Sequence, residues 1–295
     1  MSPELPASAL YSHPSLARLW KKVHLACSPF ILRPTVRQLY SQPAPLLRSH
    51  LKTQPYHVVA LGCAEGLKES LLLRKLPQPS HLTTADTSLA MARIAARKLP
   101  AKRKSAKKLD LTSPSSLSRV LQSHSNLPPP TRILTLFGVL PNLDPPPLLH
   151  RLAKTLRPCD LLLFSTNLAP GKNPRSGALR ILPQYENPPT RRWLEATARR
   201  YRPRLPQGQL VFQISSDPRQ PSLARIEARW ISSRSTKIIF SSRRPTAPQV
   251  EIWIQASGLR RLKRWIDPRG EEGVWLVQST IPPCSFPRDP KRKKR

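Results

Sequence analysis

Apolar runs alternate with amphipathic stretches along the chain from residue 57 to residue 167. Short apolar runs are typical of buried strands, and stretches with leucine and alanine recurring on one side are typical of helices. Strands that alternate with helices favour a parallel, doubly wound α/β sheet. The expected strands span residues 57–62, 81–86, 106–112, 132–138 and 161–167, and the expected helices span residues 66–76, 88–99, 113–124 and 145–156.

The pattern changes after residue 170. Residues 171–201 read as a loop that leads into a helix, and residues 223–244 contain two strand-like runs around a short polar turn. A helix over 249–259 and a last strand over 273–279 follow. This order predicts a mostly parallel seven-stranded sheet with an antiparallel terminal strand and an inserted segment before the last strands. Such a Rossmann-like α/β sheet suits a class I methyltransferase better than a dehydrogenase.

The charge balance is strongly basic, with 50 Lys and Arg against 16 Asp and Glu and a formal net charge of +34. A field this positive attracts polyanions, so nucleic acid is a partner to consider. The basic residues are spread over most of the chain, and a general enrichment in arginine also accounts for the charge.

The four cysteines, Cys27, Cys63, Cys159 and Cys284, lie far apart and form no CxxC motif. This spacing disfavours a structural zinc site or a disulfide framework and fits a reducing compartment. The N-terminal stretch lacks the features of a secretion signal, and no apolar run approaches the roughly 20 residues that span a bilayer. We therefore expect a cytoplasmic protein without a membrane partner.

The turn after residues 57–62 is the expected ligand position, because open α/β sheets bind ligands outside the carboxyl ends of their strands. Gly62, Ala64 and Gly66 are small enough to let a ligand approach the backbone, and the next helix points its first amides at the turn. Taken alone, this degenerate pattern is equally typical of a tight turn with no ligand.

Two carboxylates strengthen the ligand interpretation. Asp86 ends the second expected strand, about 20 residues beyond the turn, where a carboxylate can accept hydrogen bonds from ribose hydroxyls. Asp110, next to Leu111, lies at the end of the third expected strand, where it could take an adenine amino group. The alternative is that both are solvated loop carboxylates that balance nearby lysines.

The chain resembles the histidine-specific, S-adenosylmethionine-dependent methyltransferases of ergothioneine biosynthesis. The segments that carry this resemblance are, in order, "LGCAEGLKESLLL", "ADTS", "LDLT", "LFGVLPNLDPPPLLHRLAKTLRPCDLLLFSTNL", "QYENP" and "GLRRLKRWIDPRGEEGVWLV". Their order and spacing follow those of the family over most of residues 55–280.

The resemblance implies S-adenosyl-L-methionine as the cofactor, transfer of its methyl group to a nitrogen atom, and no metal. Positioning of the reactants then does most of the work, and no side chain is expected to act as a catalytic group. Two of the implied residues could instead serve the fold, since Asn142 could help to cap the next helix and Tyr185 could pack on the core. The resemblance assigns cofactor binding to Gly62, Lys68, Asp86, Asp110, Leu111 and Tyr11, and substrate binding to Asn142, Tyr185 and Ser242.

Five segments follow from this interpretation. Residues 1–50 form a helical cap or lid, and residues 51–170 form the Rossmann-like core that binds the cofactor. Residues 171–223 form an inserted segment on the substrate side, residues 224–281 form the C-terminal strands that complete the core, and residues 282–295 form a basic, disordered tail.

The chain departs from the family at the substrate site. A tyrosine pair of the family corresponds to Leu32 and Arg33 here, and the glutamate that faces the histidine imidazole corresponds to Phe240. Without that carboxylate the site cannot pair with an imidazole N–H, so we expect a small amino acid or related amine rather than histidine as the substrate. The alternatives are a methyltransferase of the same fold directed at RNA or the ribosome, and a non-catalytic paralogue.

Overall fold

The computed structural model of this chain describes residues 4–5, 7–10, 13–122 and 131–280. Tyr11 and the basic tail over 282–295 lie outside the described residues, so the expectations for them stay predictions.

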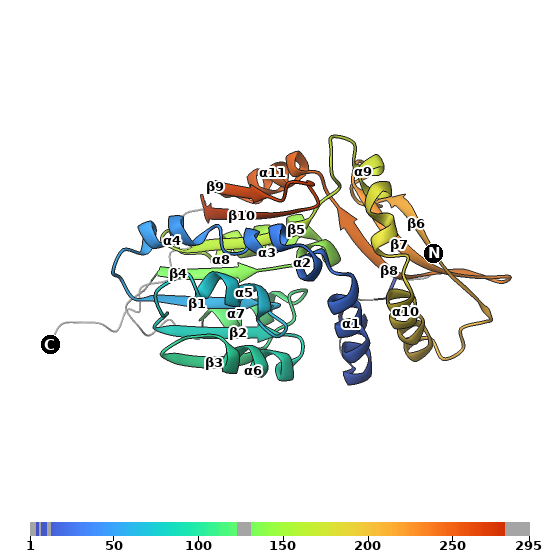
Figure 1. Cartoon of the computed structure of the whole chain (residues 1–295), viewed down its shortest axis with the longest axis horizontal. Coiled ribbons are helices and arrows are strands. Elements are labelled where there is room, and N and C mark those ends of the chain that lie inside the picture. The colour runs from blue at the N-terminus through green and yellow to red at the C-terminus, as the bar shows by residue number, and fades with distance from the viewer. Residues whose placement is uncertain (1–3, 6, 11–12, 123–130, 281–295) are drawn as a thin grey trace, which may run out of the picture.

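A seven-stranded sheet runs through the larger part of the molecule in the order β3-β2-β1-β4-β5-β10-β9 (Figure 1). The first five strands pair in parallel, and β10 is antiparallel to both β5 and β9. The predicted mostly parallel sheet with an antiparallel last strand is therefore confirmed. Its strands are β1 (Tyr56–Leu61), β2 (His81–Asp86), β3 (Arg103–Lys108), β4 (Thr131–Leu136), β5 (Leu161–Asn167), β9 (Leu259–Ile266) and β10 (Glu272–Ser279).

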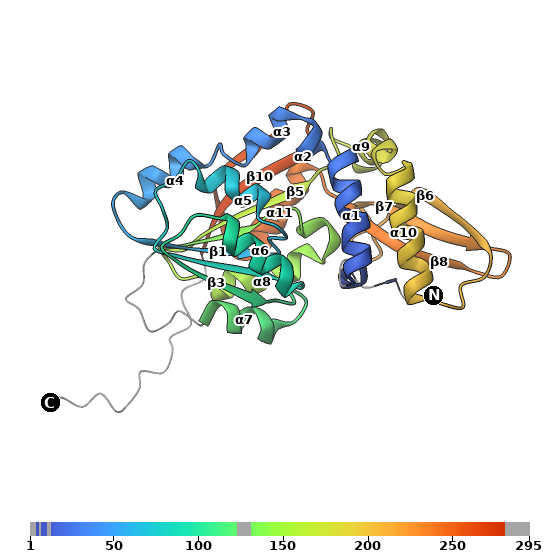
Figure 2. The same cartoon turned by 60° about the horizontal axis from the view of Figure 1, so that its bottom comes forward.

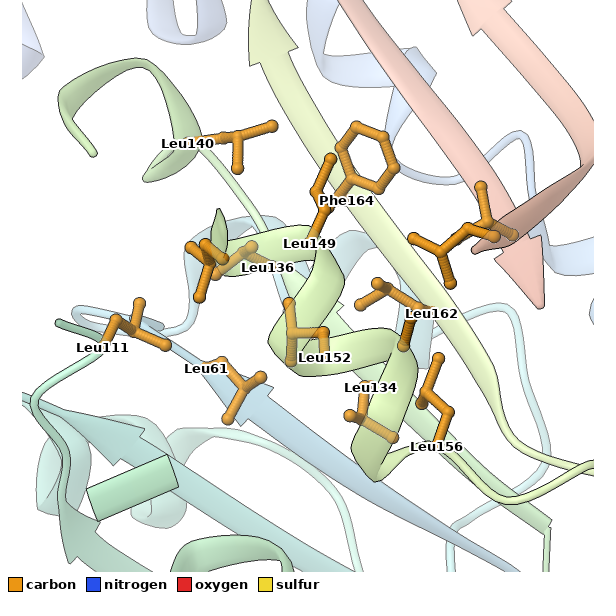
Figure 3. Packing of buried hydrophobic residues seen from close by; sticks show 14 of the residues in the cluster. Leu61, Leu111, Leu134, Leu136, Leu140, Leu149, Leu152, Leu156, Leu162 and Phe164 are labelled. Carbon is orange, nitrogen blue, oxygen red and sulfur yellow. The ribbon is translucent and has the colours of Figure 1, made fainter. Parts of the chain in front are cut away.

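Helices cover both faces of this sheet, so each face has its own core. Successive residues of β5 alternate between the two cores, because side chains along a strand point to opposite faces: Leu162 and Phe164 belong to the core shown in Figure 3, and Leu161 and Leu163 to the other. The first core is closed by α7 (Pro114–Gln122), α8 (Pro145–Thr155) and α11 (Ala247–Ala256), and the second by α3 (Pro34–Leu39), α4 (Ala44–Leu51), α5 (Leu67–Leu73) and α6 (Leu89–Lys98).

A second, antiparallel sheet with the order β6-β7-β8 lies beyond the carboxyl ends of the parallel strands (Figures 1 and 2). In both views α1 lies between those strand ends and α10, and α1 packs against α10. This part of the molecule comprises η1 (Ala7–Leu10), α1 (Pro14–Cys27), α2 (Pro29–Leu32), α9 (Pro174–Ile181), η3 (Leu182–Gln184), α10 (Pro188–Tyr201), β6 (Gly208–Ser216), β7 (Ala224–Ser232) and β8 (Thr236–Arg244).

The second sheet corrects one expectation. Residues 224–281 do not all complete the main sheet, because β7 and β8 pair with β6 instead. The reason is that β7 uses both of its edges within the small sheet, with β6 on one side and β8 on the other. Only the part from α11 to β10 returns to the main sheet.

The two edge strands of the main sheet are the ones that the apolar pattern placed poorly. The expected third strand over 106–112 lies at 103–108 in the structure, and β9 was not expected as a strand. Both are rich in Lys and Arg: the exposed side chains include Lys104 and Lys108 on β3, and Arg260 and Arg264 on β9. Charged side chains on an edge strand discourage pairing with other chains, so these strands do not need an apolar pattern.

We expect the Asp160→Ala substitution to lower the free energy of unfolding by about 3–5 kcal/mol, because it leaves the buried Arg132 guanidinium without its partner. Asp160 is fully buried and accepts from Arg132 Nε at 2.9 Å and from the Arg157 amide at 2.7 Å. Urea unfolding followed by circular dichroism measures the change. The control is Asp144→Ala, since Asp144 pairs with the exposed Arg219 and its loss should cost less than about 1 kcal/mol. Equal losses in the two variants would contradict this account.

Candidate functional site

The turn between β1 and α5 has an unusual backbone. Gly62, Ala64 and Gly66 all have positive φ, of 62°, 45° and 74°. Positive φ is rare for a residue with a side chain, so Ala64 marks a strained position. Gly62 is required twice over, because a Cβ there would also lie 2.6 Å from Cγ2 of Val139. The turn that the sequence marked only as small residues is therefore a defined, tightly packed structure.

Asp86 holds this turn in place from the end of β2. Its Oδ2 accepts from the backbone amide of Ala64 at 2.9 Å, and its Oδ1 accepts from the amide of Ser88 at 2.9 Å. The amide of Gly62 donates to the carbonyl of Ala85 at 2.7 Å. The carboxylate thus lies beside the point where strand order reverses between β1 and β4, which is where open α/β sheets bind ligands.

Asp110 and Leu111 lie in the turn after β3, two and three residues past the end of the strand. Oδ1 of Asp110 accepts from the amide of Thr112 at 2.8 Å, and Asp110 is exposed. Leu111 is buried, and its Cδ1 would lie 3.6 Å from a Cβ on Gly62. The structure therefore brings the predicted residues Gly62, Leu111 and Asp86 to one edge of the sheet, with Val139 from the loop after β4 as an additional neighbour.

Lys68 points elsewhere. Its Nζ lies 3.2 Å from Oε1 of Glu272 and 4.7 Å from the centre of the Tyr40 ring. A Cβ on Gly138 would come within 2.8 Å of the same Nζ, so that glycine makes room for the ammonium group. The Lys68 side chain is only 18% exposed and is committed to a buried ion pair.

A buried hydrogen-bond cluster around Glu272 was not predicted from the sequence. The Tyr40 hydroxyl donates to Glu272 and lies 3.1 Å from Oγ of Ser165, and that Oγ accepts from the Gly138 amide at 2.8 Å. Burial raises the pKa of Tyr40 well above its ordinary value, so the hydroxyl stays a donor. The only signal in the sequence was the position of Glu272, an acid directly before the expected last strand over 273–279 in a chain with few acids.

Helix α1 is anchored over the β1–α5 turn. Nζ of Lys21 lies 2.9 Å from Oε1 of Glu65 in that turn, and the other oxygen of Glu65 pairs with Lys98 at 2.9 Å. On the same helix, His24 stacks between Trp20 and Phe30. Burial, and then the charge of Lys68, lower the pKa of His24 to about 4, so the imidazole is neutral at pH 7. Helix α1 thus contacts the turn through Lys21 and carries a neutral, stacked imidazole.

The predicted substrate residues Tyr185 and Ser242 meet. The Tyr185 hydroxyl lies 3.5 Å from Oγ of Ser242, and the Tyr185 ring lies 5.9 Å from the ring of Phe240. Phe240 also contacts Trp193 and is buried, so it belongs to an apolar cluster. These residues come from η3, β8 and α10, which makes the inserted segment and the small sheet the walls of this region.

Asn142 ends the short helix η2 (Leu140–Asn142), which packs against both β5 and β8. The N-cap residue of α8 is Asp144, whose side chain makes no capping hydrogen bond, and the capping role considered for Asn142 stays a prediction. η2 thus lies between the main sheet and the strand that carries Ser242.

The described residues contain neither a metal-binding cluster nor a membrane-spanning helix. In that part of the chain, no group of three or more His, Cys, Asp or Glu side chains is arranged to hold a metal ion. Nor does it contain a helix that is both long enough and apolar enough to cross a membrane.

Neither the known family models nor the curated protein sequences contain a match to this chain. Solved structures do resemble it. Magnesium protoporphyrin IX methyltransferase from Synechocystis PCC 6803, with bound S-adenosylhomocysteine, superposes with a TM-score of 0.50 at 10% identity, over 91% of this chain and 96% of that one. This likeness shows the fold, which is that of the class I S-adenosylmethionine-dependent methyltransferases.

Two further structures have lower scores. An S-adenosylmethionine-dependent methyltransferase from Clostridium acetobutylicum has a TM-score of 0.47 at 11% identity, over 90% of this chain and 99% of that one. An amino pentose methyltransferase from Micromonospora echinaspora has a TM-score of 0.42 at 14% identity, over 83% of this chain and 91% of that one.

The buried carboxyl group of Glu69 in α5 makes the stability of this site depend on pH. Burial raises its pKa to about 7 from an ordinary value of 4.5, and it accepts from Thr135 Oγ1 at 3.2 Å. The folded protein therefore holds this proton more tightly than the unfolded chain, and stability falls as pH rises from about 4.5 to about 7. We expect Glu69→Gln to gain roughly 2–3 kcal/mol relative to the wild type between pH 5 and pH 8.

Urea unfolding at both pH values measures that gain. Glu65→Gln is the control, because hydrogen bonding to Lys21 lowers the pKa of Glu65 and the carboxylate is charged at both pH values. A Glu69→Gln variant that tracks the wild type at both pH values would refute the raised pKa.

Proposed function

We propose that this protein is an S-adenosyl-L-methionine-dependent N-methyltransferase that acts on a small amino acid or a related amine. One observation carries the proposal: Asp86, at the carboxyl end of β2, is hydrogen-bonded to the strained turn after β1 in a sheet of methyltransferase topology. This arrangement places a carboxylate and the backbone of a small-residue turn at the strand-order switch, where a nucleoside is held in such sheets.

The residues at this edge fit the cofactor. Both oxygens of Asp86 accept from backbone amides, and Oδ1 also accepts from the Thr87 hydroxyl at 3.3 Å. Oδ2 therefore keeps a lone pair that can accept from a ribose hydroxyl. Leu111 and Val139 offer apolar contact for an adenine ring beside Gly62, and the exposed carboxylate of Asp110 can accept from its amino group. The bound cofactor would supply an electrophilic methyl group on its sulfonium sulfur.

The residues of the chain bind the cofactor and the substrate, orient them toward each other and exclude water. We assign Asp86, Asp110, Leu111 and the Gly62 turn to the cofactor, and Tyr185, Ser242 and Asn142 to the substrate. Helix α1 contacts the turn through the ion pair of Lys21 with Glu65. Holding the two reactants in line is the main source of rate in such a transfer.

We propose a different role for Lys68 than the resemblance implies. Its ammonium group pairs with Glu272 and lies over the Tyr40 ring, so it supports the floor of the site as a positioning residue. It sets where α5 and the loop at Gly138 lie relative to each other.

The substrate assignment rests on the resemblance to the histidine-specific family and on its departures. An imidazole N–H needs an acceptor, and the corresponding position here is Phe240, packed between Tyr185 and Trp193. We therefore propose an amino acid or amine other than histidine.

We expect Asp86→Ala to weaken the binding of S-adenosylhomocysteine by roughly tenfold to a hundredfold, because it removes a charged acceptor for the ribose. Isothermal titration calorimetry of the full chain measures the affinity. Glu251→Ala, which removes a carboxylate that pairs with Arg261 and Arg264 at the β9 edge, should bind like the wild type.

Asp86 also holds the Ala64 amide, so loss of affinity alone does not distinguish contact from loop support. An S-adenosylhomocysteine analogue without the two ribose hydroxyls resolves this, since wild type and Asp86→Ala should bind it equally. Wild-type protein that binds no S-adenosylhomocysteine would overturn the proposed function, and unchanged affinity in Asp86→Ala would overturn the role of Asp86.

A further inference from the structure

Arg244, the last residue of β8, is a buried cation without an ion pair. Only 5% of the residue is exposed, and its Nε is buried without a hydrogen-bond partner. Among the described residues no carboxylate oxygen lies within 4.0 Å of its guanidinium nitrogens, whereas the buried Arg132 pairs with Asp160 and the buried Arg225 pairs with Glu227. Charged groups are rarely buried in proteins unless they are paired, so the position of Arg244 calls for a physical reason.

The two acids whose charges act on Arg244, Glu271 and Glu272, already accept hydrogen bonds from other side chains. Glu271 accepts from Arg33 at 2.8 Å and from Gln184 at 2.8 Å, and Glu272 accepts from Tyr40 and from Lys68. Burial lowers the pKa of Arg244 to about 10, and the two glutamates oppose that change. The guanidinium is therefore still charged at neutral pH, with its direct hydrogen-bonding capacity unspent.

Arg244 belongs to the substrate side of the site. Its guanidinium carbon lies 5.2 Å from the centre of the Tyr185 ring, and it follows Ser242 by two residues on the same face of β8. The side chain of the intervening Arg243 points to the other face, where it pairs with Asp217 at 2.8 Å. A desolvated guanidinium over an aromatic ring, with its N–H donors free, is suited to recognise a planar anion.

We propose that Arg244 is a carboxylate-binding residue of this site, so that one of the reactants enters with a carboxylate paired to its guanidinium. The proposal rests on the proposed function and deepens it. Two molecules can present the carboxylate: the methyl acceptor, which would then be an amino acid rather than a simple amine, and the amino-acid end of the cofactor. The chemistry of recognition is the same in both cases.

The first experiment compares ligands with and without a carboxylate on the wild type, Arg244→Met and the neighbouring control Arg243→Met. Calorimetry uses S-adenosylhomocysteine and 5′-methylthioadenosine, which lacks the amino-acid end. Thermal shift assays, run with and without S-adenosylhomocysteine, use the proteinogenic amino acids and their primary amides. Loss of a paired charge should weaken a carboxylate ligand by roughly tenfold or more in Arg244→Met.

The pattern of losses identifies the source. If Arg244→Met loses affinity for S-adenosylhomocysteine but not for 5′-methylthioadenosine, the cofactor provides the carboxylate. If Arg244→Met keeps its affinity for both nucleosides but is no longer stabilised more by an amino acid than by the amide of that amino acid, the methyl acceptor provides the carboxylate. If neither ligand pair distinguishes wild type from Arg244→Met, the proposal is wrong.

A second readout separates ligand binding from a structural role. Because Arg244 is buried without an ion pair, Arg244→Met should leave the thermal midpoint unchanged or raise it, whereas Arg132→Met should lower it sharply. A comparable loss in Arg244→Met would overturn the proposal. If that variant does not fold, Arg244→Lys keeps the charge but not the paired N–H groups, and its weaker carboxylate binding decides the question.

Failure of the proposed function looks different. In that case the wild type binds neither S-adenosylhomocysteine nor 5′-methylthioadenosine, and the comparison of amino acids with their amides still decides on Arg244. Absence of any preference for the acids in the wild type would then overturn the carboxylate site.

Discussion

The buried carboxylate of Glu272 joins the N-terminal cap, helix α5 and the last strand of the main sheet. It accepts from the Tyr40 hydroxyl and pairs with Lys68 at 3.2 Å, and its own amide donates to Asp267 at 2.7 Å. Loss of this acid would leave Lys68 largely buried without a counter-charge, a much larger cost than the loss of a surface pair. This carboxylate therefore helps to fix the cap over the strand ends, together with the ion pairs of Lys21 and Arg33.

Other acids of this chain are also buried inside the fold, as Glu272 is. Most of the basic residues that outnumber the acids are not buried. The buried acids are Glu69, Asp160, Asp217, Glu227, Asp267 and Glu272. Part of the positive charge has a structural use on the edge strands β3 and β9, where it discourages pairing with other chains. Part of the positive charge thus serves the fold, because it lies on the edge strands of the main sheet.

The two sides of the site differ in how their polar groups are satisfied. On the cofactor side Asp86 is bonded on both oxygens to turn amides, so that edge is rigid before any ligand arrives. On the substrate side Arg244 has charge without a direct partner and Tyr185 has only a long contact to Ser242. The cofactor side is therefore fixed by its own hydrogen bonds, whereas the substrate side keeps hydrogen-bonding groups free for a ligand.

Local pattern was sufficient for β1, β2, β4 and β5 and for the placement of Asp86, because a buried strand needs a continuous apolar run and its last residue lies at the sheet edge wherever the strand pairs. It failed for β9 and for both ends of β3, since an edge strand can be charged.

The sequence by itself determined the α/β class, the order of the five parallel strands along the chain and the small-residue turn. Only the tertiary structure decided that β7 and β8 pair with β6, that Lys68 faces Glu272 and that Arg244 meets no carboxylate among the residues that the structure describes. These outcomes depend on contacts between residues far apart in the chain, and no local pattern records which distant carboxylate a cation will meet.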